Sequence, residues 1–254
     1  MSANTESAAQ FLMAARERGT PGSRMPEAFR PTTIDEALAV QRRVTQLLGA
    51  AIGGYKCSVP TDPRPIAYAP ILAPTISQAS PTAVRAAGPR LQVEPEIACV
   101  IGRDLLPRST PYSEEDIRDA VKEAHFVLEV LGSRYAEFPD IPFPENLADG
   151  IANAGLFVGP AVRDPWRSPL GEFPITVTSN GKLLVTKDGK HPDRHPLRPL
   201  HWLANYLAHN GAPLREGMIV TTGSYCGIVE VPVGETLTFT YGDLGGLSAT
   251  FTAR

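Results

Sequence analysis

The stretch that decides the fold runs from residue 91 to residue 106 and reads LQVEPEIACVIGRDLL. Alternation along an extended strand sends Gln92, Glu94 and Glu96 to one face and the apolar side chains to the other. The two carboxylates then lie side by side and run directly into the apolar segment 97–101. Like charges beside a buried strand are costly unless a cation compensates them.

A third acid points to a metal site. Glu129 stands in the apolar run FVLEVL, residues 126–131, where a lone carboxylate needs a partner. Taken alone, a Glu-x-Glu pair is most often a solvated strand face, and Pro95, which cannot donate to a β-ladder, favours an edge strand or a bulge there. Three such carboxylates suggest a metal ion as the missing partner.

The composition excludes several classes of partner. In the 254 residues, 24 basic side chains stand against 27 acidic ones, which gives no strong field for nucleic acid or an anionic membrane. No run approaches the ~20 apolar residues of a membrane span. The 25 prolines and 22 glycines are spread along the chain and favour a loop-rich, largely β core. Cys57, Cys99 and Cys226 fit the reduced thiols of a cytoplasmic protein better than a disulfide framework.

Residues 1–50 form an expected N-terminal extension of helices. Composition predicts one helix over 6–18. The second, over 33–48, is better marked, because Thr33 and Glu36 have the spacing of a capping box. The Gly/Pro-bearing loop between the two helices indicates a helical pair packed on the main body.

Residues 51–254 form the expected catalytic domain, which is mostly β. A helix is predicted over 113–124, and it leads into the buried strand that carries Glu129. An Asn-Gly turn in the middle of 174–187 predicts a tight hairpin. A helix over 199–209 precedes alternating β segments that continue to the end of the chain.

Lys56 is the only charge of the short predicted strand 53–59, GGYKCSV. A strand lysine most often extends to solvent, so a functional role needs a nearby anionic site that holds the ammonium group. The following segment, 60–81, is crowded with proline and predicts an irregular loop of a length that often covers a site.

Several segments, in the same order, resemble the 2-hydroxypenta-2,4-dienoate hydratases and 2-oxohex-3-enedioate (4-oxalocrotonate) decarboxylases within the fumarylacetoacetate-hydrolase-like group. The likeness runs from about residue 33 to the end of the chain. Its most specific parts are Gly54-Tyr55-Lys56, Glu94-Pro95-Glu96, Leu128-Glu129-Val130, Ser133-Arg134, the stretch 195–204 and Thr222-Gly223-Ser224. The resemblance implies an α+β fold, a mixed β-sandwich roll of the fumarylacetoacetate-hydrolase type with a helical N-terminal part.

The resemblance also implies roles for residues at matching positions. Glu94, Glu96 and Glu129 look like the ligands of a divalent metal, Mg²⁺ or Mn²⁺, and Lys56 looks like the catalytic acid/base group. The residues expected near the substrate are Leu72, Ser133, Asp149, Thr222 and Ser224. The metal set is intact, whereas Gly132 stands where family members often carry an aspartate. Metal binding is therefore a firmer expectation than the identity of the substrate.

The implied activity is the metal-dependent hydration of a 2-hydroxy-dienoic or 2-oxo acid in aromatic-compound catabolism, by a cytoplasmic homo-oligomer. Three alternatives stay open. One is a 2-oxo-enedioate decarboxylase, and another is an acylpyruvate-type C–C hydrolase, for which His125 is the candidate base. The last is a non-catalytic metal-binding partner subunit.

The choice between hydration and decarboxylation depends on the far end of the substrate. A decarboxylase of a 2-oxo-enedioate has a second carboxylate to receive, and this calls for a cationic residue beyond the metal. Three segments expected around the pocket, 66–76, 151–158 and 221–227, contain no Lys or Arg. They predict a neutral distal end and favour hydration, although Arg64 or Arg134 could turn into the pocket.

Overall fold

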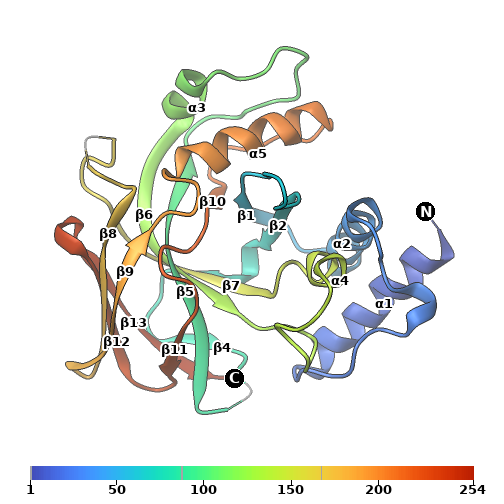
Figure 1. Cartoon of the computed structure of the whole chain (residues 1–254), viewed down its shortest axis with the longest axis horizontal. Helices are drawn as coiled ribbons and strands as arrows, with labels where there is room; N and C mark the ends of the chain where they lie inside the picture. The colour runs from blue at the N-terminus through green and yellow to red at the C-terminus, as the bar shows by residue number, and fades with distance from the viewer. Residues whose placement is uncertain (1, 87, 167) are drawn as a thin grey trace.

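A computed structural model describes residues 2–86, 88–166 and 168–254 of the chain (Figure 1). The helices are α1 (Ala3–Arg18), α2 (Ile34–Leu48), α3 (Glu114–Ala120), α4 (Phe143–Ala148) and α5 (Leu197–His209), with the 3-10 turns η1 (Glu27–Phe29), η2 (Ala73–Thr75) and η3 (Gly242–Leu244). The strands are β1 (Ile52–Ser58), β2 (Ala67–Leu72), β3 (Ile76–Ser77), β4 (Thr82–Val84), β5 (Arg90–Ile101), β6 (Val121–Leu131), β7 (Asn153–Ala161), β8 (Glu172–Ser179), β9 (Lys182–Lys190), β10 (Ile219–Thr221), β11 (Val229–Pro232), β12 (Thr236–Tyr241) and β13 (Gly246–Ala253). Within the described residues, no helix has both the length and the apolar character that a bilayer crossing requires.

The strands are arranged in two sheets. One sheet has the order β2-β1-β10-β5-β6-β7-β3, with β11 also paired to β5, and the other has the order β4-β13-β12-β8-β9. In the first sheet β1 runs parallel to β10, while β2, β5 and β6 make antiparallel pairs, so the sheet is mixed. Helices α1, α2 and α4 lie at the opposite side of the molecule from β8, β9 and β12 (Figure 1). The expected mixed β fold of the α+β class, with a helical N-terminal part, is confirmed.

The alternation along β5 positions the main core. Leu91, Val93 and Ile97 are buried in one apolar cluster with side chains of the second sheet such as Phe239 and Phe251. Burial of this face against the second sheet fixes the register of β5, because a slip by one residue would turn the glutamates into the core. The opposite face of β5 is therefore the one that carries the charged side chains.

The N-terminal helices pack on the sheets and share a core with them. The capping box of α2 is present as expected, with Thr33 and Glu36 each bonded to the backbone of the other. The buried side chain of Gln41 donates hydrogen bonds to the carbonyl oxygens of Tyr68 (3.1 Å) and Leu147 (2.8 Å), and so ties α2 to β2 and α4. Our proposed boundary after residue 50 falls in the connection between α2 and β1.

Two expectations for local structure are wrong. The segment 60–81 is not wholly irregular, because it contains β2 and β3. Strand β2 lies at the edge of its sheet, where Pro70 needs no second ladder partner. The helix predicted over 113–124 ends at Ala120, and Val121 begins β6. Val121 and Ala124 continue the helical spacing of apolar residues, but the pairing of β6 with both β5 and β7 outweighs this local preference.

Candidate metal centre and its cavity

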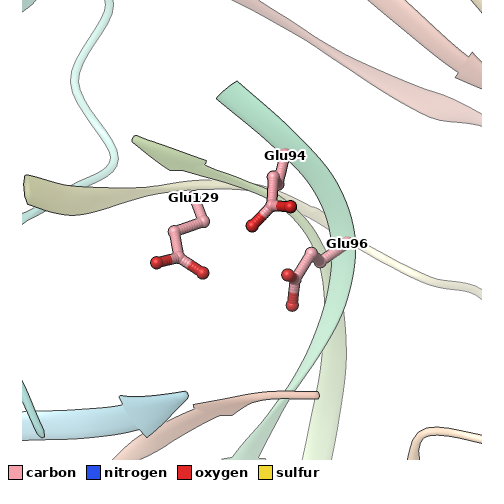
Figure 2. Close-up of side chains that lie close together, drawn as sticks. All are labelled: Glu94, Glu96 and Glu129. Atoms are coloured by element: carbon pink, nitrogen blue, oxygen red, sulfur yellow. The ribbon is translucent and has the colours of Figure 1, made fainter. Parts of the chain in front are cut away.

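Strands β5 and β6 bring three glutamates together. The two strands are antiparallel, with Glu94 directly opposite Glu129, and Glu96 lies two residues further along β5 on the same face. One carboxylate oxygen of each residue lies within 4.8 Å of the others. The three side chains converge on one space in Figure 2. The structure thus gathers the three predicted ligands into one candidate cation site.

Glu96 is more deeply buried than Glu94, the other glutamate of β5, and it is hydrogen-bonded to residues at the end of β10. Its Oε2 accepts hydrogen bonds from Thr221 Oγ1 and from the backbone N–H of Gly223, at 2.9 Å for the latter. Burial, with repulsion from Glu129 and Glu94, raises the pKa of Glu96 to about 8. Burial also raises the pKa of Glu94, against the attraction of Lys56. In the absence of a cation, this site favours protonated carboxyls.

Glu129 is fully buried, and only one of its oxygens is satisfied. Its Oε1 accepts hydrogen bonds from Lys56 Nζ (2.6 Å) and Asn153 Nδ2 (2.9 Å), whereas its Oε2 is buried without a hydrogen-bond partner among the described residues. When all three carboxyls are ionised, as metal ligands must be, the single ammonium group of Lys56 leaves two negative charges uncompensated. A hard divalent cation supplies both the missing charge and a ligand partner for the free oxygen, so the donor set fits such an ion.

Lys56 reaches the site from β1. A Cβ at the preceding Gly54 would lie 1.9 Å from the carbonyl oxygen of Ile219, so the close approach of β1 to β10 requires glycine there. The Lys56 side chain is 13% exposed, and its Nζ also donates to the carbonyl oxygen of Ile151 (3.2 Å). Burial acts to lower the pKa of Lys56, but the attraction of Glu129 and Glu94 outweighs it, and the pKa lies above its usual value. The lysine is held by anions and does not extend to solvent.

The loop that follows β10 packs against the glutamate strand β5 and is fixed by its own hydrogen bonds. Thr222 is buried, and its Oγ1 donates to the carbonyl oxygen of Ile97 (3.4 Å) and lies 3.3 Å from His191 Nε2. Ser224, further along, bonds within the loop to the carbonyl oxygen of Gly227 (3.0 Å). Thr221 begins the segment 221–227 that was expected around the pocket, but its direct contact with Glu96 was not predicted. Its only signal in the sequence is a polar residue at the end of an apolar strand.

A cavity of about 810 Å³ lies beside strands β5 and β6, next to the three glutamates along these strands. Two of its lining residues, Gln92 and Leu131, form the cross-strand pair next to the pair of Glu94 with Glu129. Asn153, which bonds to Glu129, lines it as well. Successive pairs on one face of an antiparallel ladder are about 7 Å apart. The cavity therefore begins one step along the strands from the candidate metal site.

The remaining predicted substrate residues lie at or under this cavity. Leu72 and Ser133 line it. Asp149 is fully buried beneath it, where Oδ1 accepts hydrogen bonds from Arg16 Nη1 (3.0 Å) and Arg134 Nε (2.5 Å). The carboxylate of Asp149 is thus bound to two arginines that line the cavity, and Asp149 itself does not line it.

The expectation of a neutral distal pocket is wrong. The segments on which it rested are indeed free of Lys and Arg, but the cavity is also lined by Arg16 of α1 and Arg134 of the segment after β6. These two arginines reach the cavity from parts of the chain outside those segments. Arg64, the other candidate, is paired with Asp193 and does not line the cavity.

His125, the candidate base for a hydrolase, lies away from the site. It precedes Glu129 by four residues on β6, which is about 13 Å along an extended strand. Its ring nitrogens contact the carbonyl oxygen of Gly159 (2.9 Å) and the carboxylate of Glu123 (3.1 Å). This arrangement does not present a base to a ligand at the three glutamates.

Comparison with known proteins agrees with the fold. Residues 52–252 match the family described as fumarylacetoacetate (FAA) hydrolase C-terminal. The chain belongs to this family, as the resemblance in its sequence implies.

Similar curated proteins include two named 2-keto-4-pentenoate hydratase. The one from Paraburkholderia phymatum is 32% identical over 163 residues, which cover 63% of this chain and 60% of the relative. The one from Paraburkholderia xenovorans is 27% identical over 243 residues, which cover 91% and 88%. The chain therefore spans less than two thirds of the first of these relatives and most of the second.

Among solved structures, 4-oxalocrotonate decarboxylase from Pseudomonas putida G7, complexed with magnesium and adipate, has a similar fold. The TM-score is 0.79 at 22% identity, with 97% of both chains covered. At this identity the similarity concerns the fold.

Proposed function

We propose that this chain is a divalent-metal-dependent lyase that hydrates 2-hydroxy-dienoic acids, or their 2-oxo tautomers, in the catabolism of aromatic compounds. The observation that carries the proposal is the cluster of Glu94, Glu96 and Glu129, with Lys56 bonded to it and a cavity of about 810 Å³ beside it. The curated relatives named 2-keto-4-pentenoate hydratase support the choice of reaction.

Glu94, Glu96 and Glu129 would hold the metal, which we take to be Mg²⁺ or Mn²⁺ because both prefer carboxylate oxygen. When bound, such a cation would supply a Lewis acid that withdraws electrons from the carbonyl group of a 2-oxo acid. Thr221 and Gly223 fix the orientation of Glu96, and Asn153 does the same for Glu129. The protein thus supplies ligands whose positions are set before the substrate arrives.

Lys56 is the proposed acid/base residue. Its Nζ carries a proton at neutral pH, because the neighbouring carboxylates keep its pKa high. The hydrogen bonds to Glu129 Oε1 and to the Ile151 carbonyl oxygen fix its position beside the cluster. From there Nζ can give a proton to the carbon chain of a bound substrate and take one back, as tautomerisation and hydration both require.

The other predicted residues would shape the space around the substrate. Leu72 offers an apolar wall for the hydrocarbon chain, and Ser133 a hydroxyl on the cavity surface. Asp149 would act indirectly, through the arginines that it binds. We keep Thr222 and Ser224, on the loop that contacts Glu96, as further residues near the substrate. We also propose that the enzyme is a cytoplasmic homo-oligomer, which light scattering of the purified protein would test.

Decarboxylation of a 2-oxo-enedioate is the second candidate, and the arginines of the cavity are the observation that favours it. The C–C hydrolase has no such support, because His125 is engaged elsewhere. A non-catalytic role would not account for Lys56, which is paired with Glu129 beside the three carboxylates but contributes no metal ligand.

The test is a turnover screen on enzyme stripped with EDTA and then supplied with Mg²⁺ or Mn²⁺. The panel contains 2-hydroxypenta-2,4-dienoate, 2-oxohex-3-enedioate and an acylpyruvate. Loss of dienoate absorbance and release of CO₂ are followed in the same reactions. We expect metal-dependent loss of dienoate without CO₂. Rapid CO₂ release from the enedioate with no loss of dienoate would favour the decarboxylase, and no metal-dependent turnover of any substrate would refute the proposed function.

A further inference from the structure

A second charge cluster, centred on the buried Asp149, lies at the cavity. Arg16 comes from α1, Arg134 from the segment after β6, and Asp149 from the end of α4. Asp149 Oδ1 accepts from both guanidinium groups, and its carbonyl oxygen accepts from Arg134 Nη2 and from Arg16 Nη2 (3.3 Å). Its Oδ2 accepts from the backbone N–H of Arg134 (3.1 Å). One carboxylate thus serves two arginines.

This cluster keeps a positive charge that its own residues do not neutralise. Two guanidinium groups against one carboxylate leave a net charge of +1. Burial and the neighbouring Arg134 lower the pKa of Arg16 to about 10, so Arg16 stays protonated at neutral pH but at an energetic cost. Of the five N–H donors of Arg16, two bond to Asp149. The group therefore has both charge and donors available for an anion.

A second observation points to a missing ligand. Tyr135 lines the cavity and is 1% exposed, and its hydroxyl is buried without a hydrogen-bond partner among the described residues. Burial raises the pKa of this hydroxyl, as do Asp149 and Glu145, while Arg134 and Arg16 act in the opposite direction. The phenol is therefore close to the charge cluster and remains a neutral donor. A buried hydroxyl that bonds to nothing is costly unless a ligand completes it.

The cluster is linked to the candidate metal site through a single residue. Arg134 Nη1 donates to the carbonyl oxygen of Asn153 (3.0 Å), and Asn153 Nδ2 donates to Glu129 Oε1 (2.9 Å). The uncharged side chains of Leu72 and Leu131 line the same cavity. A substrate with two anionic groups and a hydrocarbon chain between them matches this combination of metal site, arginines and apolar wall.

We propose that Arg16, Arg134 and Tyr135 bind a second carboxylate at the distal end of the substrate, so that the preferred substrates are 2-oxo or 2-hydroxy-dienoic acids with two carboxylates. The inference rests on the proposed function, because it assumes that the first carboxylate binds at the metal. Arg16 then determines specificity and takes no part in proton transfer. The second carboxylate neutralises the excess charge and accepts a hydrogen bond from the free phenol.

The test compares acids that differ only in the second carboxylate. Calorimetry in saturating Mg²⁺ measures the affinity for 2-oxoadipate against 2-oxohexanoate, and for 2-oxoglutarate against 2-oxopentanoate. We expect wild-type protein to prefer the dicarboxylate of at least one pair by roughly tenfold or more, as a charge-assisted hydrogen bond to a buried guanidinium implies.

Three variants locate the preference. Arg16→Gln should remove most of it. Tyr135→Phe removes only an unpartnered hydroxyl, so it should fold well and reduce dicarboxylate affinity roughly fivefold while monocarboxylate affinity stays the same. Arg43→Gln, which breaks an ion pair with Glu6 away from the cavity, is the matched control and should keep the wild-type preference.

The outcomes separate the two claims. Equal binding of both acids of each pair by wild-type protein overturns the distal carboxylate site and leaves the proposed function standing. A wild-type preference that persists in both Arg16→Gln and Tyr135→Phe overturns the assignment to these residues. If no 2-oxo acid binds in the presence of Mg²⁺, the proposed function itself fails.

Discussion

Replacing Glu96 by Gln should make the metal-free protein more stable and abolish its response to metal. Glu96 is buried among like charges, which raise its pKa from the usual 4.5 to about 8. A carboxyl with a raised pKa binds its proton more tightly in the folded state than in the unfolded state. Its ionisation therefore destabilises the fold by an amount that is absent below pH 4.5, grows as the pH rises, and is complete above about pH 8.

The size of the effect follows from this pKa. In the unfolded chain the Glu96 carboxyl has a pKa of 4.5, so pH 7 lies 2.5 units above it and the group is ionised. In the folded protein the same carboxyl is still protonated at pH 7. At about 1.4 kcal/mol per unit, the penalty is on the order of 3 kcal/mol. Gln carries no such penalty. Its amide oxygen can accept from Thr221 and Gly223 as the carboxylate does, and its amide nitrogen can donate to Glu94 or Glu129.

Urea unfolding in EDTA at pH 5 and pH 7.5, with and without Mg²⁺, measures both properties. We expect Glu96→Gln to be more stable than wild type at pH 7.5, nearly equal at pH 5, and insensitive to Mg²⁺. Glu145→Gln is the matched control, because Glu145 is equally buried but faces Arg24. That variant should be less stable than wild type and keep the full Mg²⁺ response. A Glu96→Gln protein less stable than wild type in EDTA at pH 7.5 would refute the reasoning.

Three further predictions concern the same site. The affinity for Mg²⁺ should rise with pH and level off above about pH 8, because binding displaces the proton that Glu96 holds with a pKa of about 8; calorimetry in buffers of different ionisation enthalpy would count the proton released. Glu94→Gln and Glu129→Gln should each lose Mg²⁺ affinity by more than about a hundredfold, and wild-type binding by both would remove the site. Gly54→Ala should cost more than about 3 kcal/mol of unfolding free energy, because its Cβ would overlap a β10 carbonyl oxygen at 1.9 Å, whereas Gly49→Ala, with nothing within 4 Å, should cost only the ~1–2 kcal/mol of its positive φ.

Local sequence patterns predicted two kinds of feature correctly. These are strands with alternating polar and apolar residues, and turns that need particular residue types. The two faces of β5 followed directly from period-two alternation, and Glu129 was found because a charge in an apolar run needs a partner. The hairpin of β8 and β9 turns at Asn180 and Gly181, both with positive φ as an Asn-Gly turn requires. In each case the deciding interaction is either local or repeated along one strand.

Long-range pairing explains what the sequence could not provide. Arg16 and Asp149 are 133 residues apart, and no spacing rule connects α1 with the end of α4. The cavity consequently seemed neutral, because only segments with a visible link to the site were considered. Thr221 and Asn153 lie in segments that were expected around the pocket, but their contacts with Glu96 and Glu129 were not predicted. A threonine that ends a strand and an asparagine in a small polar stretch are ordinary until the fold places them against these glutamates.

The central claim is that Lys56 performs acid/base chemistry beside a metal held by three glutamates. The most direct measurement is Mg²⁺ affinity and dienoate turnover on the same preparations of wild type and Lys56→Met. Lys56 contributes no ligand, and its removal leaves the three carboxylates in place. We predict Mg²⁺ binding at least as tight as wild type, with turnover reduced by about 10²–10⁴-fold at saturating metal. Wild-type turnover by Lys56→Met, or an equal loss of metal binding and turnover, would contradict the claim.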